Sequence, residues 1–424
     1  MAHQIFAICA SLLLVCCLAF AQEYVPDEMI ELVDITGWGR NSEQIRIEPW
    51  LSNSATKFLI EVYKELSEDD EEALPEYFSY LHKTRYKRSL PDETLITSFD
   101  RREIELCNNI ITFASRPPRF NTNSALSGDM FLNFNLNDIP DDLELTRGVL
   151  RIYQNPQLGV YGSGVAAEKQ TFKVSLYQPS GDYMLYISST NTTTDFRGWL
   201  ELNATSLLNN WIRFRTFQQT LFGNQLLVGV ALHKPHAETG NMQVQQIAAA
   251  DIGLVPAHVQ REMLGVQPFL IGYFNGPDLL TKVQANTDHT RRERQSDFLR
   301  HQRPLFGEHT TFEQAAKGEA KPCERYSFTL DFSFLGIENS VIAPKTFATY
   351  FCYGECNFPL GTPMSNATNH AIVQTLMHLS RPSLPKPACV PTKLSPISIL
   401  HSINEDNANL IRFSQIVAKE CGCR

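Results

Sequence analysis

Hydrophobic positions divide the long middle of the chain into one helix and a series of strands. Between residues 52 and 72, apolar side chains recur at the spacing of one helix face, which predicts an amphipathic helix capped by Ser52 or Ser54. From about residue 100 to 275, short and often alternating apolar runs predict strands, among them 172–176, 226–232 and 269–274. This region is therefore expected to be an α+β domain that is mostly β.

The last part of the chain has its own pattern. Apolar side chains alternate strictly over 326–334, which predicts a strand. Residues 369–379 predict a helix, and two further strands are expected at 393–402 and 409–419, on either side of a polar turn at 404–407. The apolar face of the helix consists of Ile372, Leu376 and Leu379.

The N-terminus has the features of a signal peptide. Residues 5–21 are almost wholly apolar, and Ala19-Phe20-Ala21 has the small-x-small pattern of a signal-peptidase site. The run is shorter than a bilayer span of about 20 residues, although an uncleaved signal anchor is the alternative. Residues 1–21 are predicted to be removed and the product to be secreted, since no later stretch is apolar enough to span a membrane.

Composition and charge exclude several classes of protein. Apolar residues make up 43% and charged residues 20% of the chain, which is typical of globular proteins. The net charge of −9 argues against a nucleic-acid binder. Residues 295–424 are nearly neutral, with 12 basic against 11 acidic residues, and the preceding 294 carry 25 against 35.

Two basic clusters are candidate processing sites. Arg85 and Arg88 fit the pattern R-x-K-R, and Arg291 and Arg294 fit R-x-x-R. Secretory convertases have acidic clefts that require such spaced cations. A solvated charge run is the alternative reading, but the polar sequence of 284–302 around the second cluster favours cleavage there.

Three N-x-[ST] triplets are candidate glycosylation sites in a secreted chain. Their acceptors are Asn191, Asn203 and Asn366.

Six cysteines in the last 102 residues follow the spacing C-x28-C-x3-C-x32-C-x31-C-x-C. Zinc coordination is one reading, but zinc-ribbon pairs prefer C-x2-C and the secretory pathway oxidises thiols. Disulfides are favoured, and no metal or other cofactor is expected; spacing alone selects no pairing. Cys107 remains as an odd thiol, either paired between chains or buried.

The cysteine-rich region resembles the bone morphogenetic protein branch of the transforming growth factor β superfamily. The segments that carry the resemblance are Cys352-Tyr-Gly-Glu-Cys356, Cys421-Gly-Cys423-Arg424, Val341-Ile342-Ala343-Pro344, Phe358-Pro359-Leu360 and 366–376. The resemblance implies a small disulfide-rich β fold, the cystine-knot growth factor with two β-fingers and one helix. It also implies a layout of signal peptide 1–21, prodomain 22–294, flexible tail 295–322 and growth factor domain 323–424.

The family pairing implies the disulfides Cys323–Cys389, Cys352–Cys421 and Cys356–Cys423. The last two would close an eight-residue ring through which the first passes. Gly354 and Gly422 suit so narrow a ring because they have no side chain. A domain this small needs such staples, since it cannot enclose a full core.

The resemblance also implies a dimer of this chain with a second copy of itself or with a related ligand. In this dimer, Ile372, Leu376 and Leu379 pack against the fingers of the partner chain. Family members carry a cysteine for an interchain disulfide where this chain has Ala388, so a non-covalent dimer is expected. Close relatives also carry tryptophans at the type I receptor surface where Ile337 and Ser340 stand here.

Type I and type II serine/threonine-kinase receptors and the chain's own prodomain are the partners that the resemblance implies. Phe358, Pro359 and Leu360 are assigned to type I receptor contact. Assigned to type II contact are Ala343, Pro344, Ser398, Ile399, Leu400 and Leu410.

These features bear on three classes of function: a signalling ligand, a ligand-sequestering protein and an enzyme. A secreted, non-enzymatic signalling ligand is favoured over a cystine-knot antagonist or matrix protein that sequesters ligands, because the helix and the convertase site match ligands. An enzyme is disfavoured: the glycines of 159–164 miss the G-x-G-x-x-G spacing, so this segment is predicted to be a turn.

Overall fold

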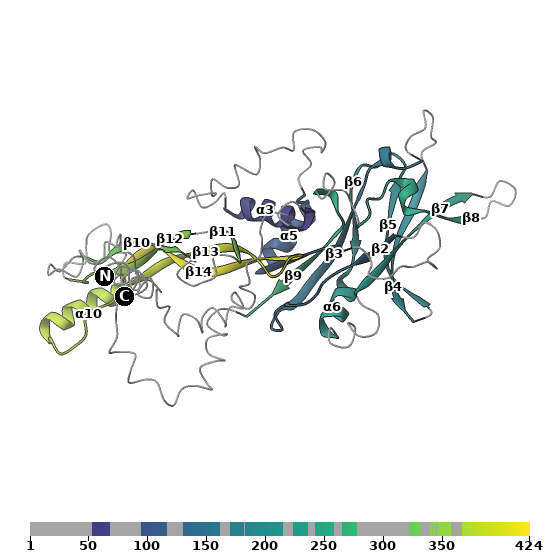
Figure 1. The fold of residues 1–424 in the computed structure, drawn as a ribbon. Coiled ribbons are helices and arrows are strands. Elements are labelled where there is room, and N and C mark those ends of the chain that lie inside the picture. The colour runs from purple at the N-terminus through teal and green to yellow at the C-terminus, as the bar shows by residue number, and fades with distance from the viewer. Residues whose placement is uncertain are drawn as a thin grey trace, which may run out of the picture.

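The structure is a computed structural model of the chain, shown in Figure 1. It describes residues 53–67, 95–116, 130–161, 170–181, 183–214, 224–235, 242–257, 265–277, 322–331, 340–344, 346–357 and 367–424. We refer to the described residues up to 277 as the N-terminal domain, and to those from 322 to 424 as the C-terminal domain.

The N-terminal domain consists mainly of strands. Its helices are α3 (Ser54–Ser67), α5 (Ser98–Leu106) and α6 (Thr205–Arg213), with 3-10 turns η2 (Pro156–Leu158) and η3 (Ala249–Ile252). Its strands are β1 (Asn109–Ala114), β2 (Met130–Asn133), β3 (Glu144–Gln154), β4 (Thr171–Ser180), β5 (Tyr183–Thr193), β6 (Gly198–Asn203), β7 (Gln225–Pro235), β8 (Met242–Ile247) and β9 (Phe269–Asn275).

The C-terminal domain has two β-fingers and one helix. Its elements are β10 (Glu324–Asp331), β11 (Val341–Ala343), β12 (Thr346–Tyr353), α10 (Asn369–Ser380), β13 (Cys389–Ser402) and β14 (Asn407–Cys423). Strands β10 and β12 form the first finger, and β13 and β14 form the second. Helix α10 lies at the end of the molecule away from the N-terminal domain (Figure 1).

A shared sheet joins the two domains. Its seven strands have the order β11-β13-β14-β1-β9-β3-β6, so β14 of the C-terminal domain pairs with β1 of the N-terminal domain. The pairing is antiparallel and runs from Asn109 opposite Ile411 to Phe113 opposite Asn407. Residues separated by some 300 positions in the sequence therefore make one continuous backbone ladder.

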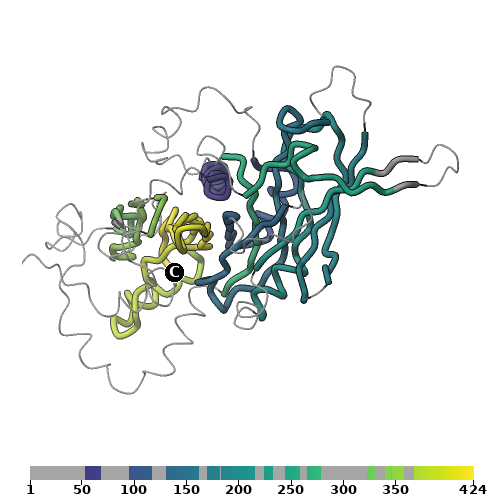
Figure 2. The backbone as a smooth tube through the Cα atoms, turned by 45° about the vertical axis from the view of Figure 1, so that its right-hand side comes forward, coloured from purple at the N-terminus to yellow at the C-terminus, as the bar shows by residue number. Residues whose placement is uncertain are grey.

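Two apolar cores lie on opposite faces of this sheet. One core fills the space between it and a second sheet of order β2-β7-β4-β5, with Trp211 of α6 fully buried among its members. The other core lies beneath α3 and draws residues from both domains, including Phe58, Tyr273 and Leu400. Figure 2 shows α3, in purple, beside the yellow strands of the C-terminal domain.

Helix α3 forms where the hydrophobic spacing predicts it, but its cap differs. Four apolar residues at the predicted helical spacing, Phe58, Leu59, Val62 and Tyr63, are buried. The capping side chain is Asn53, whose Oδ1 accepts a hydrogen bond from Thr56 N at 2.8 Å, so the expectation of Ser52 or Ser54 is wrong for the residues described. Ser54 is instead drawn inward, where its hydroxyl donates to the Gln267 carbonyl.

A buried ionic cluster fixes α5 to the sheet. The guanidinium of Arg151 on β3 contacts the carboxylates of Asp100 and Glu201, and Asp100 also accepts from the Tyr273 hydroxyl. The side chains of Arg151 and Asp100 are both 0% exposed. Burial and the adjacent Asp100 carboxylate raise the pKa of Tyr273, so its hydroxyl remains a donor.

The predicted strands are confirmed for 172–176, 226–232, 269–274, 393–402 and 409–419, and the predicted helix 369–379 is α10. Strand β10 carries the pattern predicted from Tyr326 as far as Asp331, and 332–334 lie outside the described residues. Of the segment 159–164, which is predicted to be a turn, the structure describes residues 159–161, and these form bends and a turn after η2. Gly159 is closely packed there, since a Cβ would lie 2.4 Å from the Asp251 carbonyl oxygen.

Replacement of Arg151 by Leu should destabilise the N-terminal domain by roughly 3–5 kcal/mol, because it leaves Asp100 buried without a counter-charge. The matched control is Arg101→Leu, which removes an exposed ion pair with Glu65 and should change stability little. The measurement is thermal unfolding of the secreted protein together with its secreted yield. Equal behaviour of the two variants would contradict the assignment.

Candidate functional site

Three disulfides hold the base of the two fingers together. The structure joins Cys323 to Cys389, Cys352 to Cys421 and Cys356 to Cys423, with Cα–Cα distances of 5.5, 5.6 and 5.8 Å. These are the pairs that the family resemblance implies. Each is worth about 2–4 kcal/mol, largely by restricting the unfolded chain.

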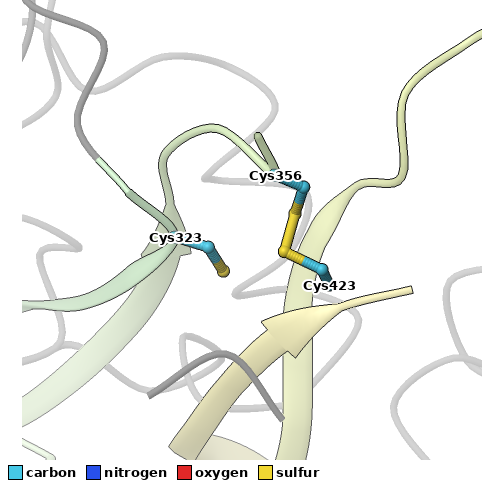
Figure 3. Close-up of side chains that lie close together, drawn as sticks. All are labelled: Cys323, Cys356 and Cys423. Carbon is cyan, nitrogen blue, oxygen red and sulfur yellow. A yellow bond between two sulfur atoms is a disulfide. The ribbon is translucent and has the colours of Figure 1, made fainter. Parts of the chain in front are cut away.

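The disulfides interlock within a very small volume. The sulfur atoms of Cys323, Cys356 and Cys423 lie within 4.8 Å of one another, and Figure 3 shows the bond between Cys356 and Cys423 beside Cys323. These sulfurs are in disulfides, not thiolates, so their proximity reflects the interlocking of the bonds and not a zinc site. Gly354 is required here: its φ is +124°, and a Cβ would lie 2.2 Å from the Pro322 carbonyl oxygen.

Helix α10 leaves one apolar face uncovered. It begins at a cap in which the Thr368 hydroxyl accepts from Ala371 N at 3.2 Å, and Ala371 and Thr375 are buried on the side toward the knot. The predicted dimer residues Ile372, Leu376 and Leu379 are 37%, 46% and 59% exposed. Val373 and Met377 are also exposed, although they are not part of the predicted apolar face. A face of this kind fits a protein partner.

Ala388 lies on the surface beside the end of the chain. Its backbone exchanges two hydrogen bonds with Arg424, of 2.8 and 3.0 Å, and its side chain is exposed. A cysteine at this position would therefore present its thiol to solvent, and not to the knot.

The residues assigned to type II receptor contact are mostly covered in this structure. Ala343, Leu400 and Leu410 are at most 2% exposed and belong to the core beneath α3. Leu400 and Leu410 stand opposite each other on β13 and β14, so they share one face of the finger. With α3, the N-terminal domain thus covers the finger face that the family assignment gives to the type II receptor, which we call the convex face.

The other three residues of that set are Pro344, Ser398 and Ile399. Pro344 is buried at the end of β11, and Ser398 is half-buried on the same face of β13 as Leu400. Ile399 lies between Ser398 and Leu400 in the strand and so faces the opposite side. Ile399 therefore does not share a face with Ser398 and Leu400, and its assignment to type II contact stays a prediction.

His401 is buried in the second finger with only one polar partner for its ring. Its Nδ1 lies 3.4 Å from the Ser402 carbonyl oxygen, and burial lowers the pKa of the imidazole to about 4. The ring is therefore neutral at physiological pH. As the pH falls from about 6.5 toward about 4, the unfolded side chain takes up a proton and the folded one does not, so the free energy of unfolding decreases over this range.

Cys107 is a buried free thiol at the end of α5. Burial and the nearby Glu103 carboxylate raise its pKa to about 12, so it is protonated and poorly nucleophilic. Of the two readings of this odd cysteine, the structure favours the buried thiol.

Several expected sites lie outside the described residues. They are the signal peptide 1–21, the processing residues Arg85, Arg88, Arg291 and Arg294, the tail 295–321, the type I contact residues Phe358, Pro359 and Leu360 with Ile337, and the acceptor Asn366. The acceptors Asn191 and Asn203 are described, and both are exposed, as a glycan requires.

Two fingers joined by interlocking disulfides, an exposed helix and an N-terminal domain that shares a sheet with them define a growth factor precursor of the cystine-knot class. The comparisons with known families agree. The model of the Transforming growth factor beta like domain matches residues 322–423, and that of the TGF-beta propeptide matches residues 39–273. The chain belongs to the transforming growth factor β family, whose members are non-enzymatic signalling ligands.

Relatives match along most of the chain. Protein screw of Drosophila melanogaster is 42% identical over 400 residues, which cover 93% of this chain and 90% of the relative. Protein 60A of Drosophila virilis is 34% identical, with 88% and 82% covered, and human Bone morphogenetic protein 8A is 29% identical, with 68% of each covered. The N-terminal domain is accordingly the prodomain, and the C-terminal domain is a bone-morphogenetic-protein-like growth factor domain.

None of the helices in the described part of the chain is both long and apolar enough to cross a membrane.

Changing Ala388 to Cys should convert a non-covalent dimer of the growth factor domain into one joined by a disulfide, because the residue is exposed and outside the knot. On a non-reducing denaturing gel the wild-type fragment should run as a monomer and the variant as a reducible dimer. The control is Ala418→Cys, since Ala418 is 2% exposed and its thiol should stay unpaired. A reducible wild-type dimer would contradict the prediction.

Proposed function

We propose that this chain is the precursor of a secreted signalling ligand. After removal of residues 1–21, cleavage following Arg294 separates the prodomain from the growth factor domain, and a cut after Arg88 divides the prodomain itself. The growth factor domain forms a non-covalent dimer with itself or a related ligand through Ile372, Leu376 and Leu379. The dimer then brings type I and type II serine/threonine-kinase receptors together, and glycans are carried at Asn191, Asn203 and Asn366.

The observation that carries this proposal is the state of the convex finger face. Leu400 and Leu410 lie under α3, where apolar side chains are removed from water. When the prodomain leaves, this face becomes an exposed apolar patch next to Ser398 and Pro344, as expected for a protein-binding surface. The prodomain and a type II receptor would then compete for one surface, so the ligand is inactive until it is released.

The dimer surface is available in both states. The exposed residues of α10 are absent from both cores that involve the prodomain. Dimerisation through this helix is therefore compatible with a bound prodomain, whereas type II binding through Leu400 is not. The ligand would then be secreted as a dimer that already carries the prodomain and does not signal until the prodomain leaves.

The test compares three proteins in cells that carry a reporter for bone morphogenetic protein signalling. They are the purified growth factor fragment, the processed complex, and a precursor with Arg291→Ala and Arg294→Ala. We expect the fragment to activate the reporter and the uncleaved precursor to be at least tenfold less potent. A fragment that fails to activate and instead inhibits an added ligand would contradict the proposal and favour an antagonist.

A point variant should locate the shared surface. Leu400→Ala in the fragment should weaken binding to a type II receptor ectodomain by roughly 2 kcal/mol, or about 30-fold, if this leucine is a central contact. The control is Leu394→Ala, an exposed leucine six positions away on the same strand, about 20 Å distant. Equal affinities of the two variants, measured by surface plasmon resonance, would exclude Leu400 from the contact.

A further inference from the structure

The tip of the second finger, residues 403–407, has a shape that its own hydrogen bonds maintain. The Asn404 Oδ1 accepts from the backbone N–H groups of Asp406 and Asn407, both at 3.1 Å. Ile403 N also donates to the Asn407 carbonyl at 2.9 Å. We call this turn the fingertip. All of these bonds lie within the growth factor domain.

The apolar end of the fingertip is inserted into the prodomain. Ile403 is only 9% exposed, and it belongs to the core between the shared sheet and the sheet β2-β7-β4-β5. Among the described residues of the growth factor domain it is the only member of that core. A side chain at the tip of a surface turn is thus buried by another domain, so its apolar area contributes to the attachment of the prodomain.

Polar side chains of the fingertip contact one prodomain loop. Asn407 is fully buried, and its Nδ2 donates to the Asn135 carbonyl at 2.8 Å. The Asn404 amide lies 3.3 Å from a carboxylate oxygen of Asp138 and 3.4 Å from the Asn137 carbonyl. A side chain without an amide group at position 407 would leave the Asn135 carbonyl without this donor.

An ion pair completes the contact. Arg116, just beyond the end of β1, pairs with Asp406, and the two side chains are 33% and 17% exposed. The position of Arg116 is set by its backbone, which donates to the Asn133 carbonyl at 2.7 Å. On the fingertip side, the Asp406 carbonyl accepts from Ala114 N at 3.0 Å. We call Arg116 and residues 135–138 the socket.

The socket differs from the other two attachments of the prodomain. The β1–β14 ladder uses backbone groups, which every sequence supplies, and α3 uses apolar contact, which many apolar sequences satisfy. The socket instead pairs with an aspartate by charge and accepts hydrogen bonds from the amide groups of two asparagines, and its Leu136 belongs to the same core as Ile403. We propose that the socket is the selective element by which the prodomain recognises this fingertip, and so determines which growth factor domain it retains after cleavage.

The inference rests on the proposed function only in that the prodomain is cut from the growth factor, and its test avoids that dependence. A site for a sequence-specific protease is placed between residues 295 and 321 of the full chain, and the secreted, tagged protein is cut in solution. The measured quantity is the dissociation constant of prodomain and growth factor after cutting. This readout needs neither the convertase nor a receptor, so failure of the signalling proposal would leave it interpretable.

Four full-length chains form a charge-exchange cycle: wild type, Arg116→Glu, Asp406→Arg, and both together. Each single variant places like charges opposite each other and should weaken retention about tenfold, and the double variant should return to within about threefold of wild type. Arg102→Glu, an exposed arginine of α5, makes the same charge change away from the socket and should have no effect. Because the double variant carries both substitutions, its recovery excludes misfolding as the cause.

Two results would overturn the proposal. One is retention that is unchanged in both single variants. The other is a double variant whose loss of binding free energy equals the sum of the losses in the two single variants. Restoring opposite charges would then give no recovery, so charge complementarity would be irrelevant. Ile403→Ala provides an independent measure that should also weaken retention about tenfold, and unchanged retention in this variant would exclude the apolar insertion.

Discussion

The architecture depends on one backbone interaction, the antiparallel pairing of β1 with β14. Without β1, β14 would have only β13 as a neighbour in this sheet, and its outer N–H and C=O groups would require other partners. The prodomain supplies that neighbour and so continues its own sheet into the growth factor. This pairing aligns α3 with the convex face of the finger and brings the fingertip to the socket.

One apolar surface therefore has two uses at two stages. In the precursor, Leu400 and Leu410 form part of a core with α3, and burial stabilises both domains. In the proposed free ligand the same side chains are available to a receptor. The growth factor domain stays folded when the prodomain's apolar contacts are lost, because three disulfides hold it together. A domain of this size without them would depend on the prodomain to stay folded.

Local patterns in the sequence predict the parts of this structure that depend on local physics. The strands β4, β7 and β9 follow from alternation and apolar runs, and α3 follows from helical spacing. The disulfide pairing could not be derived from spacing and came through the resemblance carried by motifs such as Cys352-Tyr-Gly-Glu-Cys356. The family assignment does not show that Ile399 faces away from Ser398 and Leu400, because it lists neighbours in sequence together whereas a strand alternates them.

The joint between the domains has no local signal. Ile110 and Leu410 are separated by 300 positions, and each has the pattern of an ordinary strand residue. Likewise, no pattern in the sequence marks Arg116 and Asp406 as partners, and only the fold brings them together. The buried Arg151 is also undetectable from its surroundings, since arginines are usually exposed and its partner Asp100 lies on a different element.

Amide hydrogen exchange tests the central claim, the β1–β14 pairing, most directly. Arg412 N donates to the Asn108 carbonyl, so by alternation the amides of Ala408, Leu410 and Arg412 point toward β1, and those of Asn409 and Ile411 point toward β13. In the cut complex, both sets should exchange slowly. In the free growth factor, the first set should exchange at least about tenfold faster while the second stays protected. Equal exchange of the first set in the two states would contradict the account.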